Sequence, residues 1–196
     1  MEENNVPLPP PLQPNKLSVT KVNISTEKLF GGIGLIFIFL SMIPFIGLLF
    51  WLIGYTLLTV GMYQLSKKLN NPAIFNNFLI AVVLSITSWI IAFMFGIISS
   101  ISIASLSHMN SGIDVGMAII LITLYFVFLV VAYFYNKAYT LLALSTKHNL
   151  FRIASITMFI GVVTTIILIG FIVMFVGLLL LVIAFFTAPD EIEVVT

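Results

Sequence analysis

Residues 29–63 read LFGGIGLIFIFLSMIPFIGLLFWLIGYTLLTVGMY, and this run contains no charged side chain. As one continuous helix it would be about 52 Å long, whereas the hydrocarbon core of a bilayer is about 30 Å thick. Pro44 lies near the middle of the run, where it removes a backbone donor and disfavours helix at Ile43. The run therefore predicts a helical hairpin that turns within residues 41–47.

Three further apolar runs follow, at about residues 78–106, 115–135 and 153–187. The last is as long as the first, and a softer break around residues 167–170 predicts a second hairpin. Asn71-Pro72 is typical of a helix start. The sequence predicts an all-α, polytopic transmembrane bundle of about six passes over residues 29–188. A proline-rich tail at residues 1–28, expected to be extended or disordered, precedes it, and a short acidic tail at residues 189–196 follows.

The composition excludes whole classes of protein. Hydrophobic residues make up 61% of the chain and charged residues 8%, which is too few polar side chains to cover a water-soluble globule. The net charge of +1, without a basic block, excludes nucleic-acid binding as a main role. Cysteine is absent, and the two histidines, His108 and His148, lie in polar segments. We therefore expect neither a metal nor another cofactor.

The basic residues decide the orientation, because lysine and arginine near membrane ends mark the cytoplasmic side. If both hairpins return to the side from which they entered, all eight basic residues fall on one side of the membrane. We expect a multi-pass protein of the plasma membrane with both termini in the cytoplasm. A re-entrant hairpin that does not cross fully would satisfy the same charge rule, so both forms remain open.

Small residues recur at helical spacing and predict close helix packing. Residues 46–61 align with residues 169–184, which suggests an internal repeat of the second hairpin arms. The predicted packing residues are Gly47, Gly54, Gly61, Gly170 and Gly177 on these arms, and Ser88, Ala92, Gly96, Ser100 and Ala104 on the third helix. Contact with the chain's own helices is the expected role, and contact with a partner or a second copy is the alternative.

Candidates for chemistry are few. No aspartate, glutamate, lysine, arginine or histidine lies in the core of a predicted pass, which counts against an ion-coupled transporter. Ser107, His108 and Asp114 share one short loop, and nothing in the sequence holds a base against a nucleophile, so we do not expect an enzyme. Lys147, His148 and Arg152 form a basic cluster beside the membrane. This cluster could bind anionic lipid headgroups, or it could simply set the topology.

Several motifs resemble a known family. They are the GGIG opening at residues 31–34, the I-P-x-I-G break at residues 43–47, the I-F-N-N segment at residues 74–77, and LLLLVIAFFTA at residues 178–188. Over about residues 29–188 the chain resembles a family of uncharacterised, mainly archaeal multi-pass membrane proteins, the domain of unknown function 996. This resemblance implies an integral membrane protein, and it carries no activity or functional residue.

Taken together, these features favour a non-catalytic accessory or structural subunit of a larger membrane complex. Its expected partners are membrane lipid and either other membrane subunits or further copies of itself. The alternative is a channel or uncoupled transporter for a small solute, which would need a continuous polar face across several helices.

Overall fold

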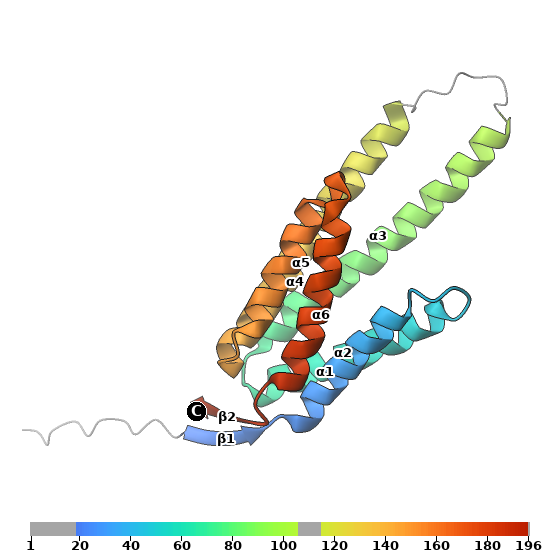
Figure 1. Ribbon diagram of the computed structural model, residues 1–196. Helices are drawn as coiled ribbons and strands as arrows, with labels where there is room; N and C mark the ends of the chain where they lie inside the picture. The colour runs from blue at the N-terminus through green and yellow to red at the C-terminus, as the bar shows by residue number, and fades with distance from the viewer. Residues whose placement is uncertain (1–18, 106–114, 196) are drawn as a thin grey trace, which may run out of the picture.

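A computed structural model describes residues 19–105 and 115–195, with side chains placed except at residues 19, 95–105, 115–117, 120 and 195. Six α-helices and two short strands make up the fold (Figure 1). In chain order they are β1 (Val19–Asn23), α1 (Ser25–Leu40), α2 (Gly47–Lys68), α3 (Pro72–Ser105), α4 (Val115–Thr146), α5 (Leu150–Val163), the 3₁₀ turn η1 (Thr165–Ile167), α6 (Ile169–Thr187) and β2 (Glu191–Val195). The predicted all-α bundle with two helical hairpins is confirmed.

Both predicted hairpins form, and their turns are short. α1 ends at Leu40 and α2 begins at Gly47, so the first turn occupies the predicted segment. The second break comes slightly earlier than expected, because α5 ends at Val163. The backbone of Leu168 adopts a φ of 59°, which a continuous right-handed helix cannot contain. The hydroxyl of Thr164 donates to the Ile160 carbonyl oxygen at 2.8 Å, as hydroxyls within the unbroken helices also do.

The helices follow one another around a ring. Each of α1 to α5 packs against the next helix in the chain, and α6 returns to pack against α1. The interior of the ring is apolar near the strand end, where Met62, Ile74, Phe78, Phe151 and Phe185 are completely or almost completely buried. Farther from that end the α1–α2 hairpin diverges from the α3–α4 pair (Figure 1). The ring is therefore tightly closed at one end only.

A two-stranded sheet joins the two ends of the described chain, which corrects part of the expected tail. β1 and β2 pair in antiparallel fashion, with Val22 opposite Ile192. We expected residues 1–28 to be a proline-rich tail, extended or disordered, and residues 189–196 to be a short acidic tail. The prolines of that tail lie outside the described residues, and residues 19–23 are extended as a strand. α1 begins earlier than expected, at Ser25, and the acidic tail supplies β2. The pairing is stable because Ile192 is buried at 4% exposure against the helices.

Two ion pairs reinforce this end. The ammonium of Lys28 lies 2.6 Å from the Asp190 carboxylate and donates to the Ala188 carbonyl oxygen at 2.7 Å. The Glu27 carboxylate is buried, and Lys68 of α2 contacts it at 2.8 Å. Lys68 also donates to the carbonyl oxygen of Asn23 at 2.7 Å. We call the sheet and these two ion pairs the terminal clasp.

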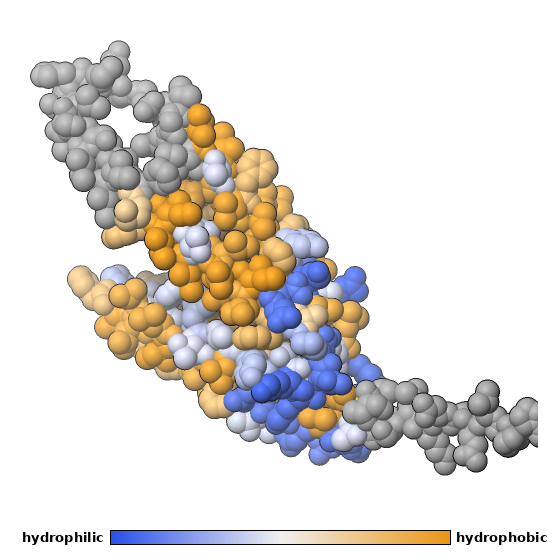
Figure 2. All heavy atoms as spheres, turned by 180° about the vertical axis from the view of Figure 1, so that it is seen from behind, coloured by the Kyte–Doolittle hydropathy of each residue, from blue (hydrophilic) through white to orange (hydrophobic). Residues whose placement is uncertain are grey.

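The outer surface of the ring is hydrophobic. Four helices are long and apolar enough to cross a membrane: α2, residues 72–94 of α3, residues 121–146 of α4, and α6. α5 is apolar but shorter. Figure 2 shows hydrophobic side chains over the helices and hydrophilic ones gathered near the clasp. Large apolar side chains that face outward in a monomer mark contact with lipid or protein, so the fold is that of a membrane protein.

The clasp generates a stability prediction. Lys68→Ala should leave the buried Glu27 carboxylate without its cation, and we expect it to lower the free energy of unfolding by about 1–3 kcal/mol. This is less than a fully buried pair would lose, because Lys68 is 40% exposed. Thermal unfolding in detergent measures the effect. Lys67→Ala, the exposed neighbour, is the control and should change stability little; equal losses in the two variants would contradict a specific role for the pair.

Candidate functional site

Glycines hold the first hairpin together. A Cβ placed on Gly34 would lie 2.6 Å from the backbone nitrogen of Leu58, and one on Gly54 would lie 2.8 Å from the nitrogen of Ile38. Gly61 faces the backbone of Gly31 in the same way, at 2.8 Å. These distances leave no room for a side chain, so α1 and α2 touch backbone to backbone. Of the two roles considered for these glycines, packing within the chain is the one that the structure shows.

The second hairpin repeats this arrangement. Gly161 of α5 would meet Met174 of α6 at 2.5 Å, and Gly177 of α6 would meet Met158 of α5 at the same distance. Gly170 packs against the backbone of α5 near Gly161 and the turn. The sequence analysis identified the glycines of the second arms but missed their partners on the first arms. The GGIG motif at residues 31–34 could have indicated the partner glycines in α1, whereas Gly161 belongs to no such motif.

The two hairpins correspond residue by residue at a separation of 123 positions. Ser41 and Thr164 each follow the last residue of the first arm, and each hydroxyl bonds back to that arm: Ser41 donates to the Ile38 carbonyl oxygen, and Thr164 donates mainly to that of Ile160. Phe45 and Leu168 occupy equivalent positions and both have positive φ, at 70° and 59°. L-residues with bulky side chains rarely adopt this conformation. Two matching rare conformations support the alignment of residues 46–61 with residues 169–184.

The small residues of α3 are only partly described. Ser88 is 1% exposed, and its hydroxyl donates to the Leu84 carbonyl oxygen at 2.6 Å. Ala92 is half-buried. Gly96, Ser100 and Ala104 lie within α3, but their side chains are outside the described residues. Of the described part of this ridge, Ser88 is enclosed by the protein and Ala92 is partly covered.

A group of hydroxyls occupies the interior where α2, α3 and α4 meet. The Tyr135 hydroxyl is buried and has no hydrogen-bond partner within the described residues, although the hydroxyls of Tyr55 and Ser85 lie beside it. The Ser85 hydroxyl donates instead to the Ala81 carbonyl oxygen at 2.7 Å. Tyr135 also packs edge-on against Phe78, with ring centroids 5.7 Å apart. We call Tyr55, Ser85 and Tyr135 the hydroxyl cluster.

A small cavity lies between α4 and α5, next to this cluster. Its volume is about 160 Å³, and aromatic and aliphatic side chains form most of its wall. Ser155 and Asn136 line one end, and the Ser155 hydroxyl donates to the Asn136 side-chain oxygen at 3.0 Å. Tyr135 of the hydroxyl cluster also lines the cavity, but most of the wall is apolar, so the cavity offers an apolar surface rather than a polar path.

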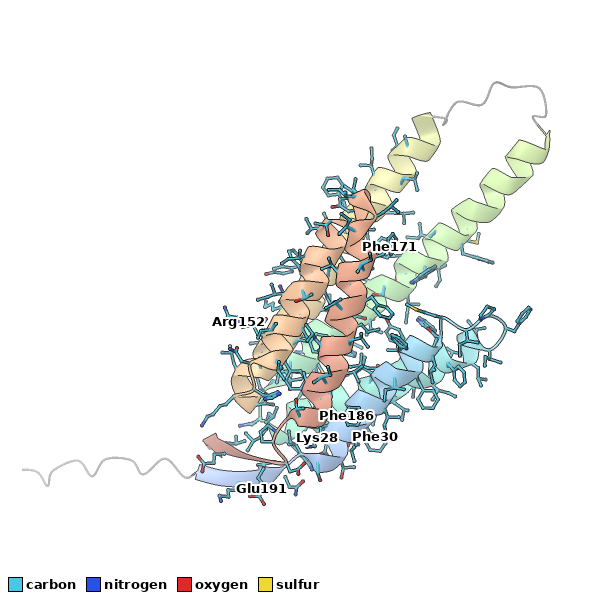
Figure 3. All side chains as sticks on the ribbon, in the orientation of Figure 1. Lys28, Phe30, Arg152, Phe171, Phe186 and Glu191 are labelled. Atoms are coloured by element: carbon cyan, nitrogen blue, oxygen red, sulfur yellow. The ribbon has the colours of Figure 1, made fainter. Side chains whose placement is uncertain are left out.

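The three residues of the predicted basic cluster, Lys147, His148 and Arg152, do not all face outward. Lys147 and Arg152 are exposed, and Arg152 projects away from α5 (Figure 3). His148 turns toward α6, where its Nε2 lies 3.1 Å from the Thr187 hydroxyl. Partial burial, and secondarily the nearby charge of Lys28, lower the pKa of His148 below its ordinary value. This shift favours the neutral imidazole, so Lys147 and Arg152 are the exposed positive residues that a lipid headgroup would meet.

The faces of α2 and α3 that point toward each other form another candidate site, which would bind protein rather than a small molecule. Near the clasp the two helices touch, with the rings of Tyr63 and Phe75 5.1 Å apart. The face of α3 that carries Phe75 continues away from the clasp through Ile86 and Phe93, which lie 11 and 18 residues later and hence on the same side of the helix. The face of α2 that carries Tyr63 continues in the same direction through Leu52, 11 residues earlier in the chain. We call these two faces the stripes of α3 and α2.

No other described part of the chain covers these outer residues of α2 and α3. Leu48 and Leu52 are 75% and 53% exposed on α2. Trp89 and Phe93 are 62% and 69% exposed on α3, and Ile86 is 39% exposed. A notch separates the two elements in the space-filling view (Figure 2). We call these five residues and the notch between them the α2–α3 opening. The sequence analysis missed it.

The candidates of the outer loop cannot be placed. Ser107, His108 and Asp114 lie outside the described residues. Among the side chains that are described, no three histidine, aspartate or glutamate residues come close enough to hold a metal ion.

The helical ring and its apolar exterior define a polytopic α-helical membrane protein. The model of a family described as a protein of unknown function, DUF996, matches residues 50–179. The chain is also 30% identical over 181 residues to the uncharacterized protein MJ1644 of Methanocaldococcus jannaschii, covering 88% of this chain and 97% of that protein. The chain belongs to the DUF996 family. No solved structure matches it.

The glycine contacts generate a second prediction. Gly54→Ala should destabilise the first hairpin by about 1–3 kcal/mol, because its new methyl group would press on the backbone of α1, which cannot turn aside. Unfolding in detergent measures this loss. Gly32→Ala is the matched control: its methyl group would meet the ring of Phe186, an exposed side chain that can rotate. Equal losses in both variants would contradict the importance of the backbone contact.

Proposed function

We propose that this protein is a non-catalytic accessory subunit of a larger membrane complex, and that a transmembrane helix of a partner subunit lies in the α2–α3 opening. The observation that carries this proposal is the exposure of matched helix stripes. The stripes of α2 and α3 touch near the clasp and are uncovered farther out, at Leu52 and Phe93.

The chemistry of the opening favours an apolar helix as its occupant. Every side chain that defines it is large and uncharged, and transmembrane helices associate through van der Waals packing rather than through charge. The opening lies between two diverging helices, so a third helix, about 10 Å across, could extend both contacts. The described glycines of α1, α2, α5 and α6 already pack within the chain itself, and the exposed faces of α2 and α3 at the opening remain for association.

Site-specific photo-crosslinking tests the proposal in membranes that contain the natural partners. We expect a photoreactive residue at Leu52 or Phe93 to give one discrete protein adduct. The same residue at Ile183, an exposed position on α6 away from the opening, is the control and should give lipid adducts. The proposal fails if the opening positions give lipid adducts alone and the protein purifies in gentle detergent as a free monomer.

One observation favours the second candidate, a channel or uncoupled transporter for a small solute. The Tyr135 hydroxyl is buried within the ring without a partner, beside two further hydroxyls, and a solute or water could bind there. The described interior does not continue this polarity on both sides, because buried apolar side chains such as Phe78 and Met62 fill the clasp end.

Flux into liposomes separates the two candidates. The purified protein, reconstituted alone, should pass no small neutral or ionic solute if it is an accessory subunit. A flux that Tyr135→Phe reduces several-fold, without a change in thermal stability, would instead establish the transport role, because that substitution removes only the hydroxyl.

A further inference from the structure

The accessory role proposed above makes no use of the cavity between α4 and α5. Its volume is about 160 Å³, and most of its wall is made of aromatic and aliphatic side chains such as Phe128, Met158 and Phe159. Protein interiors contain few voids larger than a water molecule. Apolar cavities of this size stay dry and bind small apolar groups. The cavity therefore suits a hydrocarbon group better than water or a polar solute.

The cavity is elongated along the two helices. Its wall includes Phe128 and Tyr139 of α4, which are separated by about 16 Å of helix rise, and Ser155 and Val162 of α5, which are separated by about 10 Å. This stretch of α4 lies within residues 121–146, which are long and apolar enough to cross a membrane. The cavity is partly open, and Phe128 in its wall is 37% exposed. A lipid chain matches this shape and can enter from the membrane.

One end of the cavity carries an unused hydrogen-bond donor. The side-chain oxygen of Asn136 accepts from the hydroxyls of Thr140 at 3.1 Å and Ser155 at 3.0 Å. The side-chain nitrogen of Asn136 has no acceptor among the described residues. An amide nitrogen carries two N–H donors. Because Asn136 lines the cavity, this nitrogen can donate to an oxygen atom of a bound molecule.

Positive charge lies just beyond this polar end. Arg152 is exposed on α5, one helical turn before Ser155 or about 4.5 Å of rise. Lys147, in the turn between α4 and α5, is exposed as well, and neither residue makes an ion pair within the described chain. A guanidinium group binds phosphate through paired hydrogen bonds. An apolar space, a donor and a cation thus follow one another in the order of the parts of an anionic lipid.

We propose that the cavity between α4 and α5 binds one hydrocarbon chain of an anionic membrane lipid. The polar linkage of the lipid accepts from Asn136, and its phosphate lies at Arg152. This assignment goes beyond a role of the basic residues in topology, because a charge that only sets topology needs no chain site beside it. The site lies on α4 and α5, so the proposal does not depend on a partner helix in the α2–α3 opening.

Photo-crosslinking at two neighbouring positions of α5 tests the proposal. Phe159 lines the cavity, whereas Ile160 is 48% exposed and does not belong to its wall. A photoreactive phenylalanine replaces either residue in the full chain. The protein is reconstituted in vesicles of equal amounts of phosphatidylglycerol, which is anionic, and phosphatidylcholine, which is zwitterionic. We expect lipid adducts at residue 159 to be enriched at least threefold in phosphatidylglycerol, and those at residue 160 to reflect the vesicle. Adducts of the same composition at both positions would overturn the proposal.

Two pairs of variants then separate the headgroup contact from the chain site. Arg152→Gln should abolish the enrichment at residue 159, whereas Lys137→Gln, an exposed lysine outside the cavity wall, should preserve it. Val162→Phe fills part of the cavity and should reduce adducts at residue 159 several-fold, whereas Val163→Phe, its exposed neighbour outside the wall, should not. Thermal unfolding in detergent checks that each variant is folded. Enrichment that persists in Arg152→Gln would exclude the headgroup contact, and adducts undiminished in Val162→Phe would exclude the chain site.

Discussion

The ring depends on how closely its helices approach each other. Within a bilayer the lipid is as apolar as leucine, so the helices gain little from hiding apolar surface and must associate through close packing. Glycine at Gly34 and Gly54 in one hairpin, and at Gly161 and Gly177 in the other, brings the arms into backbone contact. The two arms of each hairpin therefore pack as a close pair, and α3 and α4 complete the ring between the hairpins. Without those contacts the outer halves of the hairpins would have little to hold them together.

Much of this fold could be predicted from local signals. Pro44 marks the first turn, and Asn71-Pro72 marks the start of α3, because each residue type has a fixed backbone preference. The β1 strand could not be predicted in this way. VTKVN is short, and its partner strand lies at the opposite end of the chain. The same limit applies to the α2–α3 opening: helices that are apolar on every side give no periodic signal to show which face meets protein and which meets lipid.

The polar groups of the helices are largely occupied by the chain itself. The hydroxyls of Thr56, Thr59 and Thr87 donate to carbonyl oxygens four residues earlier in their own helices. Such bonds satisfy a polar group without creating a binding site. Tyr135 is the exception among the described residues, because its hydroxyl remains free in the interior. An accessory role fits the occupied groups, and the transport role depends on that single exception.

The terminal clasp also orders events during biosynthesis. β1 emerges from the ribosome before either hairpin, whereas its partner β2 emerges only after both hairpins have been made. Contacts between residues so distant in sequence form late, whereas the arms of each hairpin are neighbours along the chain and can pack as soon as both are made. The edge of β1 therefore stays unpaired until β2 has been synthesised. A chain truncated before β2 would retain both hairpins and still expose that edge to other proteins.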